Sequence, residues 1–476
     1  MGPTQRGAYK RLFFVQGGTY MDLQALASRQ QAYFDAGHTR PAAFRRAQLQ
    51  KLTDALRAHE PALVRALAED LGKSPSESYL SEVGMIYAEA REMQRHLGKW
   101  ARPQRVPTPL ANFPGKGRIY PEPYGRCLIL APWNYPALLS LQPLVGALAA
   151  GNCAVLKPSE YAPHTARVLE DILTQAFAPE YVAVVQGGPE VSQALCQHPF
   201  DLIFYTGGGQ VGRKVMAAAA QHLTPVILEL GGKSPCIVDQ TADLALAARR
   251  IVWGKFLNAG QTCVAPDYLL VHQDVCQPLL ERMRETIAAF YGPEPLQNPD
   301  YPKIISPRHF ERLTGLLAGC RVLAGGKTDP DACKIAPTLL GDVDMDSPIM
   351  QEEIFGPLLP VLPYAGLDEA FAQVRSGPKP LAAYCFTRDR HTQQRFLHTL
   401  SFGGGCINDT VMHLASPALP FGGVGESGMG AYHGQASFEA FTHRKGVLKK
   451  GLWPDIPLRY PPYTKRKQDM IRKVMK

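Results

Sequence analysis

The feature that most restricts the fold is an alternation of strand-like and helix-like segments that begins at Gly125. Short apolar runs rich in Val, Ile and Leu are each followed by a longer segment with apolar residues at helical spacing. This alternation predicts a parallel sheet with helices on both faces, because parallel strands need a crossover between them. We expect strands at residues 126–131, 154–157, 182–186 and 202–205, and helices at residues 136–149, 164–177, 189–196 and 211–222.

The flanking segments indicate further parts of the molecule. Residues 22–100 have the spacing of helices, with five leucines between positions 49 and 67 near helical periodicity. Residues 101–124 hold six prolines and few helix formers, which favours an extended arm or an edge hairpin. A second αβ region runs from about Asp243 to Phe402, and a glycine-rich segment follows it.

Length and cysteine content limit the class of protein. A chain of 476 residues that is 45% hydrophobic is long enough for two or three domains with a sizeable core. It has neither 18 uninterrupted apolar residues nor the apolar region of a signal peptide, so we expect a cytoplasmic protein. The ten cysteines form no CxxC pair and no zinc-like cluster, so we expect reduced thiols and no metal site.

The net charge of +9 is concentrated at the two ends of the chain. Residues 1–20 carry three basic groups, and residues 463–476 carry six basic groups and one acidic group. The body is therefore nearly neutral, which argues against a nucleic-acid-binding face. In the tail, Ile471 and Met475 have the spacing of one helix face. We favour a solvated helix there over contact with an anionic membrane surface.

The segment at residues 258–266, Asn-Ala-Gly-Gln-Thr-Cys-Val-Ala-Pro, places Cys263 between small and polar residues. A thiol nucleophile needs such a setting so that a substrate carbon can approach. Glu229 lies 34 residues upstream, and a base of this kind would activate the water that releases a thioester. Taken alone, the cysteine reads as a small buried hydrophobe and the glutamate as a salt-bridged structural residue.

Three motifs follow the expected strands. Asn134, after the first strand, either donates its amide to an oxyanion or caps a helix. Lys157 and Glu160 end the second strand, where α/β sheets bind nucleotides, although an exposed ion pair would look the same. Residues 204–212 form a glycine-rich turn from strand to helix that could face a pyrophosphate, but such turns are common and the spacing is not GxGxxG.

These motifs, with Glu353 and Phe355 in residues 351–357, resemble in content and order those of the aldehyde dehydrogenase superfamily. The likeness extends from about Thr39 to Pro462 and is nearest to the class 3 branch of fatty and aromatic aldehyde dehydrogenases. The segments that carry the likeness to this branch are residues 222–226, 263–268, 428–434 and 459–462.

The resemblance implies a role for each motif. Cys263 would be the nucleophile, with Asn134 and the Cys263 backbone N–H holding the oxyanion. Glu229 would be the first choice as the base that activates water, and Glu353 the second. The cofactor-binding residues would be Trp133, Lys157, Glu160, Gly207, Gly208, Gly212, Glu353 and Phe355. The family more often has Ser or Thr at the position of Gly208, so a side-chain contact to phosphate would be missing there.

The resemblance also implies an α/β fold with a Rossmann-type cofactor domain, an α/β catalytic domain and a small oligomerisation arm. The enzyme would oxidise a medium- or long-chain aliphatic or an aromatic aldehyde to the acid, as a homodimer. Glu160 favours NAD, because a carboxylate repels a 2′-phosphate, but NADP stays possible. The expected parts are an N-terminal extension (1–21), the cofactor domain (22–100 and 125–229), the catalytic domain (230–430), the arm (101–124 and 431–446) and a basic tail (447–476).

Overall fold

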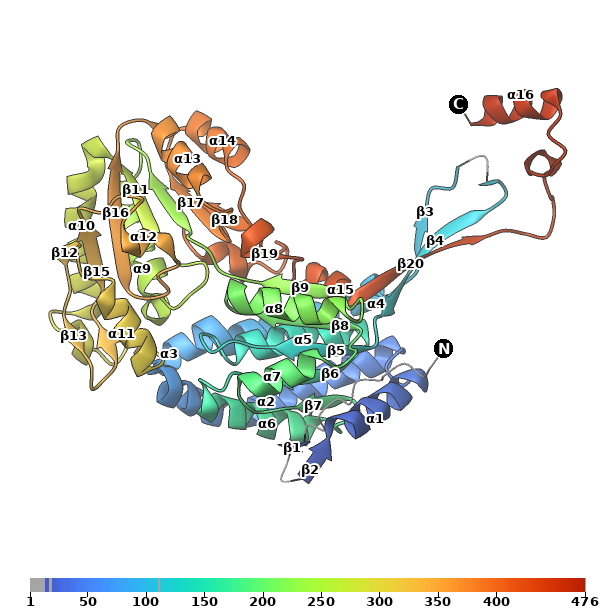
Figure 1. Ribbon diagram of the computed structural model, residues 1–476, viewed down its shortest axis with the longest axis horizontal. Helices are drawn as coiled ribbons and strands as arrows, with labels where there is room; N and C mark the ends of the chain where they lie inside the picture. The colour runs from blue at the N-terminus through green and yellow to red at the C-terminus, as the bar shows by residue number, and fades with distance from the viewer. Residues whose placement is uncertain (1–12, 17–18, 110–111, 476) are drawn as a thin grey trace, which may run out of the picture.

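Two α/β lobes and a projecting arm make up the molecule, in a computed structural model that describes residues 13–16, 19–109 and 112–475 (Figure 1). The first lobe contains a six-stranded sheet in the order β19-β9-β8-β5-β6-β7, parallel except for β19. The order reverses between β5 and β8, and ligands of open α/β sheets bind at such a reversal. The strands are β5 (Arg126–Leu130), β6 (Cys153–Lys157), β7 (Val182–Val184), β8 (Leu202–Thr206), β9 (Val226–Glu229) and β19 (Gly428–Met429).

Helices cover both faces of this sheet, which confirms the predicted fold class. Leu128 and Leu130 of β5 pack with α1, α7 and α8, whereas Cys127 and Ile129 pack with α2, α4, α5 and α6. Because both faces are covered, β5 is buried throughout. The helices are α1 (Leu23–Asp35), α2 (Ala42–Leu71), α3 (Pro75–Ser78), the π-helix η1 (Tyr79–Val83), α4 (Gly84–Trp100), α5 (Leu138–Ala150), α6 (Pro163–Ala176), α7 (Pro189–Cys196) and α8 (Gly209–Ala220). The predicted strands and helices from residue 126 to 222 are confirmed, with ends that differ by at most two residues.

The second lobe contains a seven-stranded sheet in the order β12-β15-β16-β11-β10-β17-β18, in which only β12 is antiparallel to its neighbour. The strands are β10 (Pro235–Val238), β11 (Tyr268–His272), β12 (Arg321–Ala324), β15 (Thr338–Gly341), β16 (Leu358–Tyr364), β17 (Ala382–Phe386) and β18 (Gly404–Ile407), with the short pair β13 (Thr328–Asp329) and β14 (Lys334–Ile335) beside them. The helices are α9 (Leu244–Phe256), η3 (Leu257–Gly260), α10 (Gln273–Tyr291), η4 (Pro295–Gln297), α11 (Pro307–Gly315), α12 (Pro348–Gln351), α13 (Leu367–Ser376), α14 (Arg390–Thr399), η5 (Met412–Ala415) and η6 (Gly425–Ser427).

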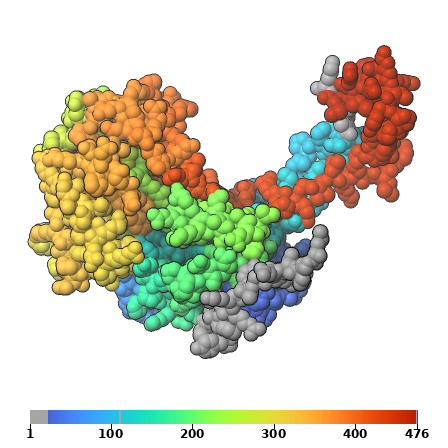
Figure 2. Space-filling view, in the orientation of Figure 1, coloured from blue at the N-terminus to red at the C-terminus, as the bar shows by residue number. Residues whose placement is uncertain are grey.

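The arm is a three-stranded antiparallel sheet in the order β20-β4-β3 that extends away from both lobes (Figures 1 and 2). Its strands are β3 (Gln104–Val106), β4 (Lys116–Pro123) and β20 (Thr442–Lys449). Of the segment 431–446 assigned to the arm from the sequence, only residues from Thr442 onwards lie in this sheet. Gln435–Ala440 instead form α15, whose Ser437 packs against Gly146 of α5.

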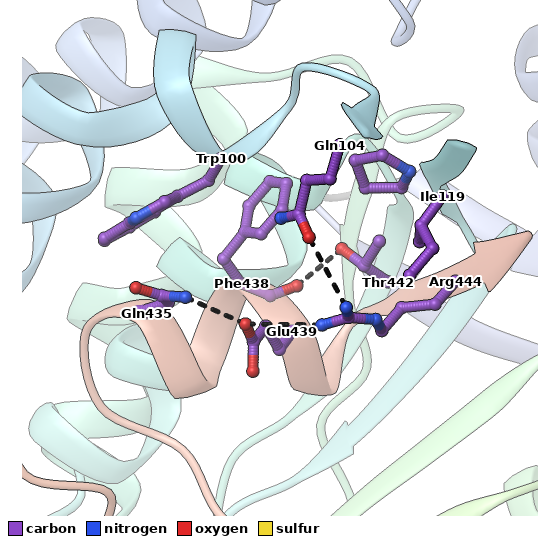
Figure 3. A pocket seen from close by; sticks show the side chains of 9 residues that line it. Trp100, Gln104, Ile119, Gln435, Phe438, Glu439, Thr442 and Arg444 are labelled. Carbon is purple, nitrogen blue, oxygen red and sulfur yellow. Dashed lines mark hydrogen bonds and ion pairs between the residues drawn. The ribbon is translucent and has the colours of Figure 1, made fainter. Parts of the chain in front are cut away.

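The base of the arm is joined to the first lobe by a small set of contacts (Figure 3). The rings of Trp100 and Phe438 lie 6.0 Å apart, between α4 and α15. Arg444 of β20 donates to the Gln104 side chain of β3 at 3.4 Å and pairs with Glu439 at 3.7 Å. The arm therefore begins at a packed aromatic contact with polar groups at its rim.

The two ends of the chain carry short elements. β1 (Phe13–Gln16) and β2 (Thr19–Asp22) form an antiparallel pair within the predicted N-terminal extension, whereas residues 1–12 and 17–18 lie outside the described residues. Beyond the arm, the tail contains η7 (Pro457–Arg459) and α16 (Lys465–Val474). Across the described ranges, no helix combines the length and apolar character needed to cross a bilayer.

Candidate active site

Cys263 lies in the turn that connects α9 to β11, between the two lobes. Three consecutive residues, Asn258, Ala259 and Gly260, adopt left-handed backbone conformations there, with φ of 53°, 50° and 74°. A Cβ on Gly260 would lie 2.2 Å from the carbonyl oxygen of Gly356, so only glycine fits this close approach. The turn leaves Cys263 half-buried in the wall of an apolar pocket.

The electrostatic surroundings of the thiol favour its neutral form. Burial raises the pKa of Cys263, and the nearby carboxyl groups of Glu353 and Glu229 raise it further. The charges of both predicted bases therefore act on the ionisation of this thiol. Cys263 can therefore ionise in two ways: a base removes its proton, or the negative charges of Glu353 and Glu229 are lost.

Glu229 is the last residue of β9 and is 2% exposed. Neither of its carboxyl oxygens has a hydrogen-bond partner among the described residues. Burial raises the pKa of this carboxyl group well above its usual value. A buried acid without a partner is unusual in a protein core and is a common feature of catalytic sites.

Asn134 lies just beyond the end of β5, at the point where the strand order reverses. Its side-chain Nδ2 donates to the carbonyl oxygen of Gln261 at 3.1 Å, which brings the amide to the turn that carries Cys263. The neighbouring Tyr135 hydroxyl lies 2.5 Å from Oγ1 of Thr262. The structure thus places the predicted oxyanion donor beside the predicted nucleophile. The second hydrogen on Nδ2 is available to another acceptor.

The adjacent strand ends hold the predicted cofactor residues of the first lobe. Nζ of Lys157 pairs with the Glu160 carboxylate at 2.5 Å, at the carboxyl end of β6. At the end of β8, a Cβ on Gly208 would meet no atom within 4 Å, and no described side chain caps α8. The hydroxyl of Thr206 is also buried without a hydrogen-bond partner in the described ranges. An open helix N-terminus beside an unused donor fits a pyrophosphate group.

The second lobe supplies Glu353 and Phe355 from the loop after α12. Glu353 is so close to Gly231 that a Cβ there would lie 2.0 Å from its Oε2. Burial and the charge of Asp267 raise the pKa of Glu353 to about 8. The Phe355 ring lies 5.3 Å from the Trp133 ring, nearly perpendicular to it. Predicted cofactor residues from the two lobes therefore face each other.

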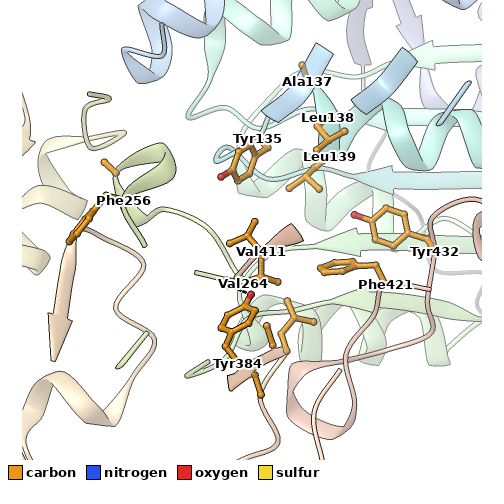
Figure 4. Close-up of a cluster of buried hydrophobic side chains, with 14 of the residues drawn as sticks. Tyr135, Ala137, Leu138, Leu139, Phe256, Val264, Tyr384, Val411, Phe421 and Tyr432 are labelled. Atoms are coloured by element: carbon orange, nitrogen blue, oxygen red, sulfur yellow. Dashed lines mark hydrogen bonds between the residues drawn. The ribbon is translucent and has the colours of Figure 1, made fainter. Parts of the chain in front are cut away.

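The pocket beside Cys263 is lined almost entirely by apolar side chains. Figure 4 shows Leu138 and Leu139 on one side, facing Val411 and Tyr432 on the other. The imidazole of His433 also lines the pocket, and burial lowers its pKa to about 3, so the wall carries no charge near neutral pH. The other aliphatic and aromatic residues of the lining are Leu80, Met85, Tyr135, Trp253, Leu257, Val264, Met412, Leu414, Ala415 and Phe421.

Sequence reasoning did not find this pocket. Its walls come from η1, α5, α9 and the loop that includes η5, which are far apart in the sequence. Sequence reasoning also missed Lys73 and Glu82, a buried ion pair that contacts the Asn134 turn. Lysine and glutamate are common surface residues, so their identity gave no signal of burial.

A doubly wound sheet with an open glycine turn is typical of nucleotide-binding proteins, and here a cysteine in the wall of an apolar pocket lies next to it. The chain belongs to the aldehyde dehydrogenase family, because the family model described as "Aldehyde dehydrogenase family" matches residues 7–447. It is thus an aldehyde oxidoreductase that uses NAD(P), as predicted.

Individual relatives agree with this assignment. The chain is 48% identical to 4,4'-diaponeurosporen-aldehyde dehydrogenase of Staphylococcus aureus, over 91% of this chain and 95% of the relative. It is 48% identical to human aldehyde dehydrogenase family 3 member B1, over 92% of this chain and 94% of the relative. The solved structure described as the substrate-bound state of Staphylococcus aureus AldH superposes with a TM-score of 0.94 at 46% identity, covering 95% of this chain and 99% of that one. The predicted class 3 likeness is confirmed.

Proposed function

We propose that this enzyme oxidises medium- or long-chain aliphatic or aromatic aldehydes to carboxylic acids through a covalent intermediate on Cys263. Oxidation of an aldehyde to an acid is the reaction of the family. One observation carries the proposal: the Cys263 thiol opens into an apolar pocket while the carboxyl groups of Glu229 and Glu353 lie close enough to raise its pKa.

The first half of the proposed reaction forms a bond between Sγ of Cys263 and the aldehyde carbon. One of the buried carboxylates takes the thiol proton, which offsets the unfavourable ionisation of Cys263. The carbonyl oxygen becomes an oxyanion and accepts hydrogen bonds from the free Nδ2 hydrogen of Asn134 and the N–H of Cys263. The oxyanion then re-forms the carbonyl as hydride leaves the same carbon, which gives a thioester on Sγ of Cys263; NAD(P), when bound, would accept that hydride.

The second half releases the acid from the thioester. The Glu229 carboxylate removes a proton from a water molecule, whose oxygen attacks the thioester carbon, and Sγ of Cys263 leaves as the thiolate. A raised pKa suits this task, because a base works best when its proton affinity is near the operating pH. Glu353 is the alternative base. It differs from Glu229 in that it would also bind the cofactor.

Most of the residues that would hold the cofactor lie near the carboxyl ends of the strands of the first lobe, and Glu353 and Phe355 lie in the second lobe. Lys157 and Glu160 would bind the adenosine ribose, and the turn of Gly207, Gly208 and Gly212 would receive the pyrophosphate. Glu353 would bind the nicotinamide ribose, and Trp133 and Phe355, whose rings contact each other, would lie near the nicotinamide. The Glu160 carboxylate disfavours a 2′-phosphate, which supports NAD as the preferred cofactor.

The pocket supports the proposed substrate class. Its lining offers dispersion contacts and few polar partners, so binding free energy grows with the apolar surface of the aldehyde, at about 0.8 kcal/mol for each buried methylene group. The Staphylococcus aureus relative is named for 4,4'-diaponeurosporen-aldehyde. The apolar pocket favours hydrophobic aldehydes over small or charged ones.

We further propose that the chain is divided into a cofactor domain, a catalytic domain and an arm, as predicted from the sequence. We also propose that it forms a homodimer through this arm. Val447 and Leu448 of β20 are 40% and 45% exposed, and Leu452 and Trp453 follow them with almost no cover. A cluster of exposed apolar side chains on a projecting sheet is typical of a protein interface.

The test is NADH or NADPH formation with aldehydes of increasing chain length and with benzaldehyde. We expect kcat/KM to rise about fourfold for each added methylene group until the pocket is filled. We also expect kcat/KM to be higher with NAD than with NADP. A preference for short or charged aldehydes would reject the substrate class. Absence of turnover by the folded, reduced enzyme with both cofactors would reject the proposed activity.

A further inference from the structure

The pair of Lys73 and Glu82 is a fully buried ion pair in the first lobe. Both side chains are 0% exposed, and Nζ of Lys73 lies 2.6 Å from Oε1 of Glu82. Lys73 lies in the link between α2 and α3, and Glu82 in the π-helix η1. Removing two charges from water is costly, so a buried pair needs further hydrogen bonds around it.

Those hydrogen bonds all go to one turn, residues 134–138. Nζ of Lys73 donates to the backbone carbonyl of Asn134 at 3.0 Å and lies 4.1 Å from the centre of the Tyr135 ring. Oε2 of Glu82 accepts from the backbone N–H groups of Ala137 and Leu138, at 2.8 and 3.1 Å. The carboxylate thus caps the N-terminus of α5, where a negative charge is stabilised by the helix dipole.

The same turn is attached to the nucleophile on its other side. Asn134 donates to the Gln261 carbonyl, and the Tyr135 hydroxyl contacts Thr262, the residue before Cys263. The Asn258 side chain also donates to the Asn134 carbonyl, at 2.7 Å. Lys73 and Glu82 therefore act on the position of the Asn134 amide relative to Sγ of Cys263. Neither of them lines the pocket beside Cys263, so they do not contact the aldehyde there.

We propose that Lys73 and Glu82 are positioning residues for aldehyde oxidation, which hold the turn 134–138 so that the Asn134 amide meets the oxyanion formed at Cys263. The inference rests on the proposed role of Asn134. An oxyanion donor acts only when it is fixed in advance at the position where charge develops. The buried pair provides this fixation, because a charge without its partner would be strongly unfavourable in the core.

The test is a double-mutant cycle between Glu82→Gln and Asn134→Ala, with kcat at saturating aldehyde and NAD as the readout. Glutamine keeps the size of the side chain but removes the charge that holds Lys73 and caps α5. We expect Glu82→Gln to lower kcat about 100-fold, because a small misplacement of a catalytic group has an effect of this order. In the Asn134→Ala background, it should lower kcat by less than about threefold, since the donor that it positions is already absent.

Two further variants separate positioning from general loss of stability. Asp70 is a matched control: it is a buried carboxylate that accepts from the backbone N–H groups of His164 and Thr165 at the N-terminus of α6 rather than of α5. Asp70→Asn should leave kcat within about threefold of wild type, although it removes the same kind of helix cap. If Glu82→Gln does not fold, the double variant Lys73→Met/Glu82→Gln, which removes both charges, takes the place of Glu82→Gln in the double-mutant cycle.

The outcomes distinguish this inference from the proposed function. Equal losses of kcat from Glu82→Gln in both backgrounds, or an equal loss from Asp70→Asn, would overturn the positioning role and leave the proposed reaction intact. A wild-type kcat for Asn134→Ala alone would overturn both the role of Asn134 and the inference. The dissociation constant of NAD, measured by fluorescence, should change by less than about threefold in every variant.

Discussion

At the scale of single residues, burial sets the acid–base chemistry of the site. Cys263, Glu229 and Glu353 share an environment that disfavours charge, and each has a raised pKa. The two carboxyl groups raise the pKa of the thiol further once they are ionised. Removal of either carboxyl charge should therefore lower the pKa of the Cys263 thiol.

Replacing Glu353 should therefore make Cys263 ionise at lower pH. Glu353 has a pKa of about 8, so its charge is present in the alkaline range, where the thiol begins to ionise. In Glu353→Gln that charge is absent, and the pKa of Cys263 should fall. The midpoint of the rate of alkylation by iodoacetamide against pH should move to lower pH, because the thiolate is the reacting species.

The exposed neighbour Glu352 provides the control for this experiment. Glu352→Gln removes a carboxylate from the same loop, but solvent screens that charge, so the midpoint should stay at the wild-type value. An unchanged or higher midpoint in Glu353→Gln would show that Glu353 does not act on the thiol.

At the scale of elements, the turn between α9 and β11 positions the nucleophile through its backbone. Gly260 has φ of 74°, and its Cα faces the carbonyl oxygen of Gly356 at a distance that leaves no room for a Cβ. Gly292, which ends α10, has nearly the same φ of 73° but nothing within 4 Å of a Cβ. The two glycines share conformational strain and differ in steric contact.

Gly260→Ala should therefore lower kcat/KM by roughly 100-fold, because the turn must move to relieve the clash and Cys263 moves with it. Gly292→Ala should cost about 1–3 kcal/mol of unfolding free energy, because its φ of 73° and ψ of −173° are adopted almost only by glycine, and it should leave kcat/KM unchanged. Urea denaturation and steady-state kinetics measure the two effects. Similar kcat/KM values for both variants would mean that the close approach at Gly260 does not position the thiol.

The strands and helices of the first lobe were predictable because each is a continuous run with its own periodicity. The α/β fold and the approximate bounds of β5, β6, β8 and their helices followed from this pattern. The motif residues Cys263, Glu229 and Asn134 were predictable from the family resemblance, and the structure brings them together. Their roles remain predictions that the variants above and below test.

The pocket and the buried pair could not be predicted, because they arise from tertiary contacts. Leu80 and Met412 line one pocket although more than 300 residues separate them. The sequence around Lys73 and Glu82 shows two common charged residues, and only packing reveals that both are buried. The arm was only partly predicted, because Ser437 packs α15 against α5 before β20 begins.

At the scale of the whole molecule, the arm extends too far from the lobes to bury its own apolar residues (Figure 2). Trp453 is 85% exposed, so replacing it removes little packing within the chain. If a second copy covers this surface, Trp453→Glu should convert the dimer to a folded monomer, because an unpaired charge in an interface is strongly unfavourable. Light scattering after size exclusion measures the mass directly.

Leu223 is the control for this variant, since it is 91% exposed on the body of the first lobe rather than on the arm. Leu223→Glu should keep the wild-type mass. A wild-type chain that is monomeric, or a Trp453→Glu variant that remains dimeric, would contradict assembly through the end of the arm and the start of the tail.

The central claim is that Cys263 carries the acyl group and that Glu229 drives its release. The most direct measurement is the reaction of Glu229→Gln with NAD and decanal, followed by NADH absorbance and by mass spectrometry of the protein. The account predicts one NADH per active site in a rapid burst, a steady rate reduced by roughly 100-fold or more, and a decanoyl group on Cys263. Continuous turnover at the wild-type rate, or an NADH burst without an acyl group on Cys263, would contradict it.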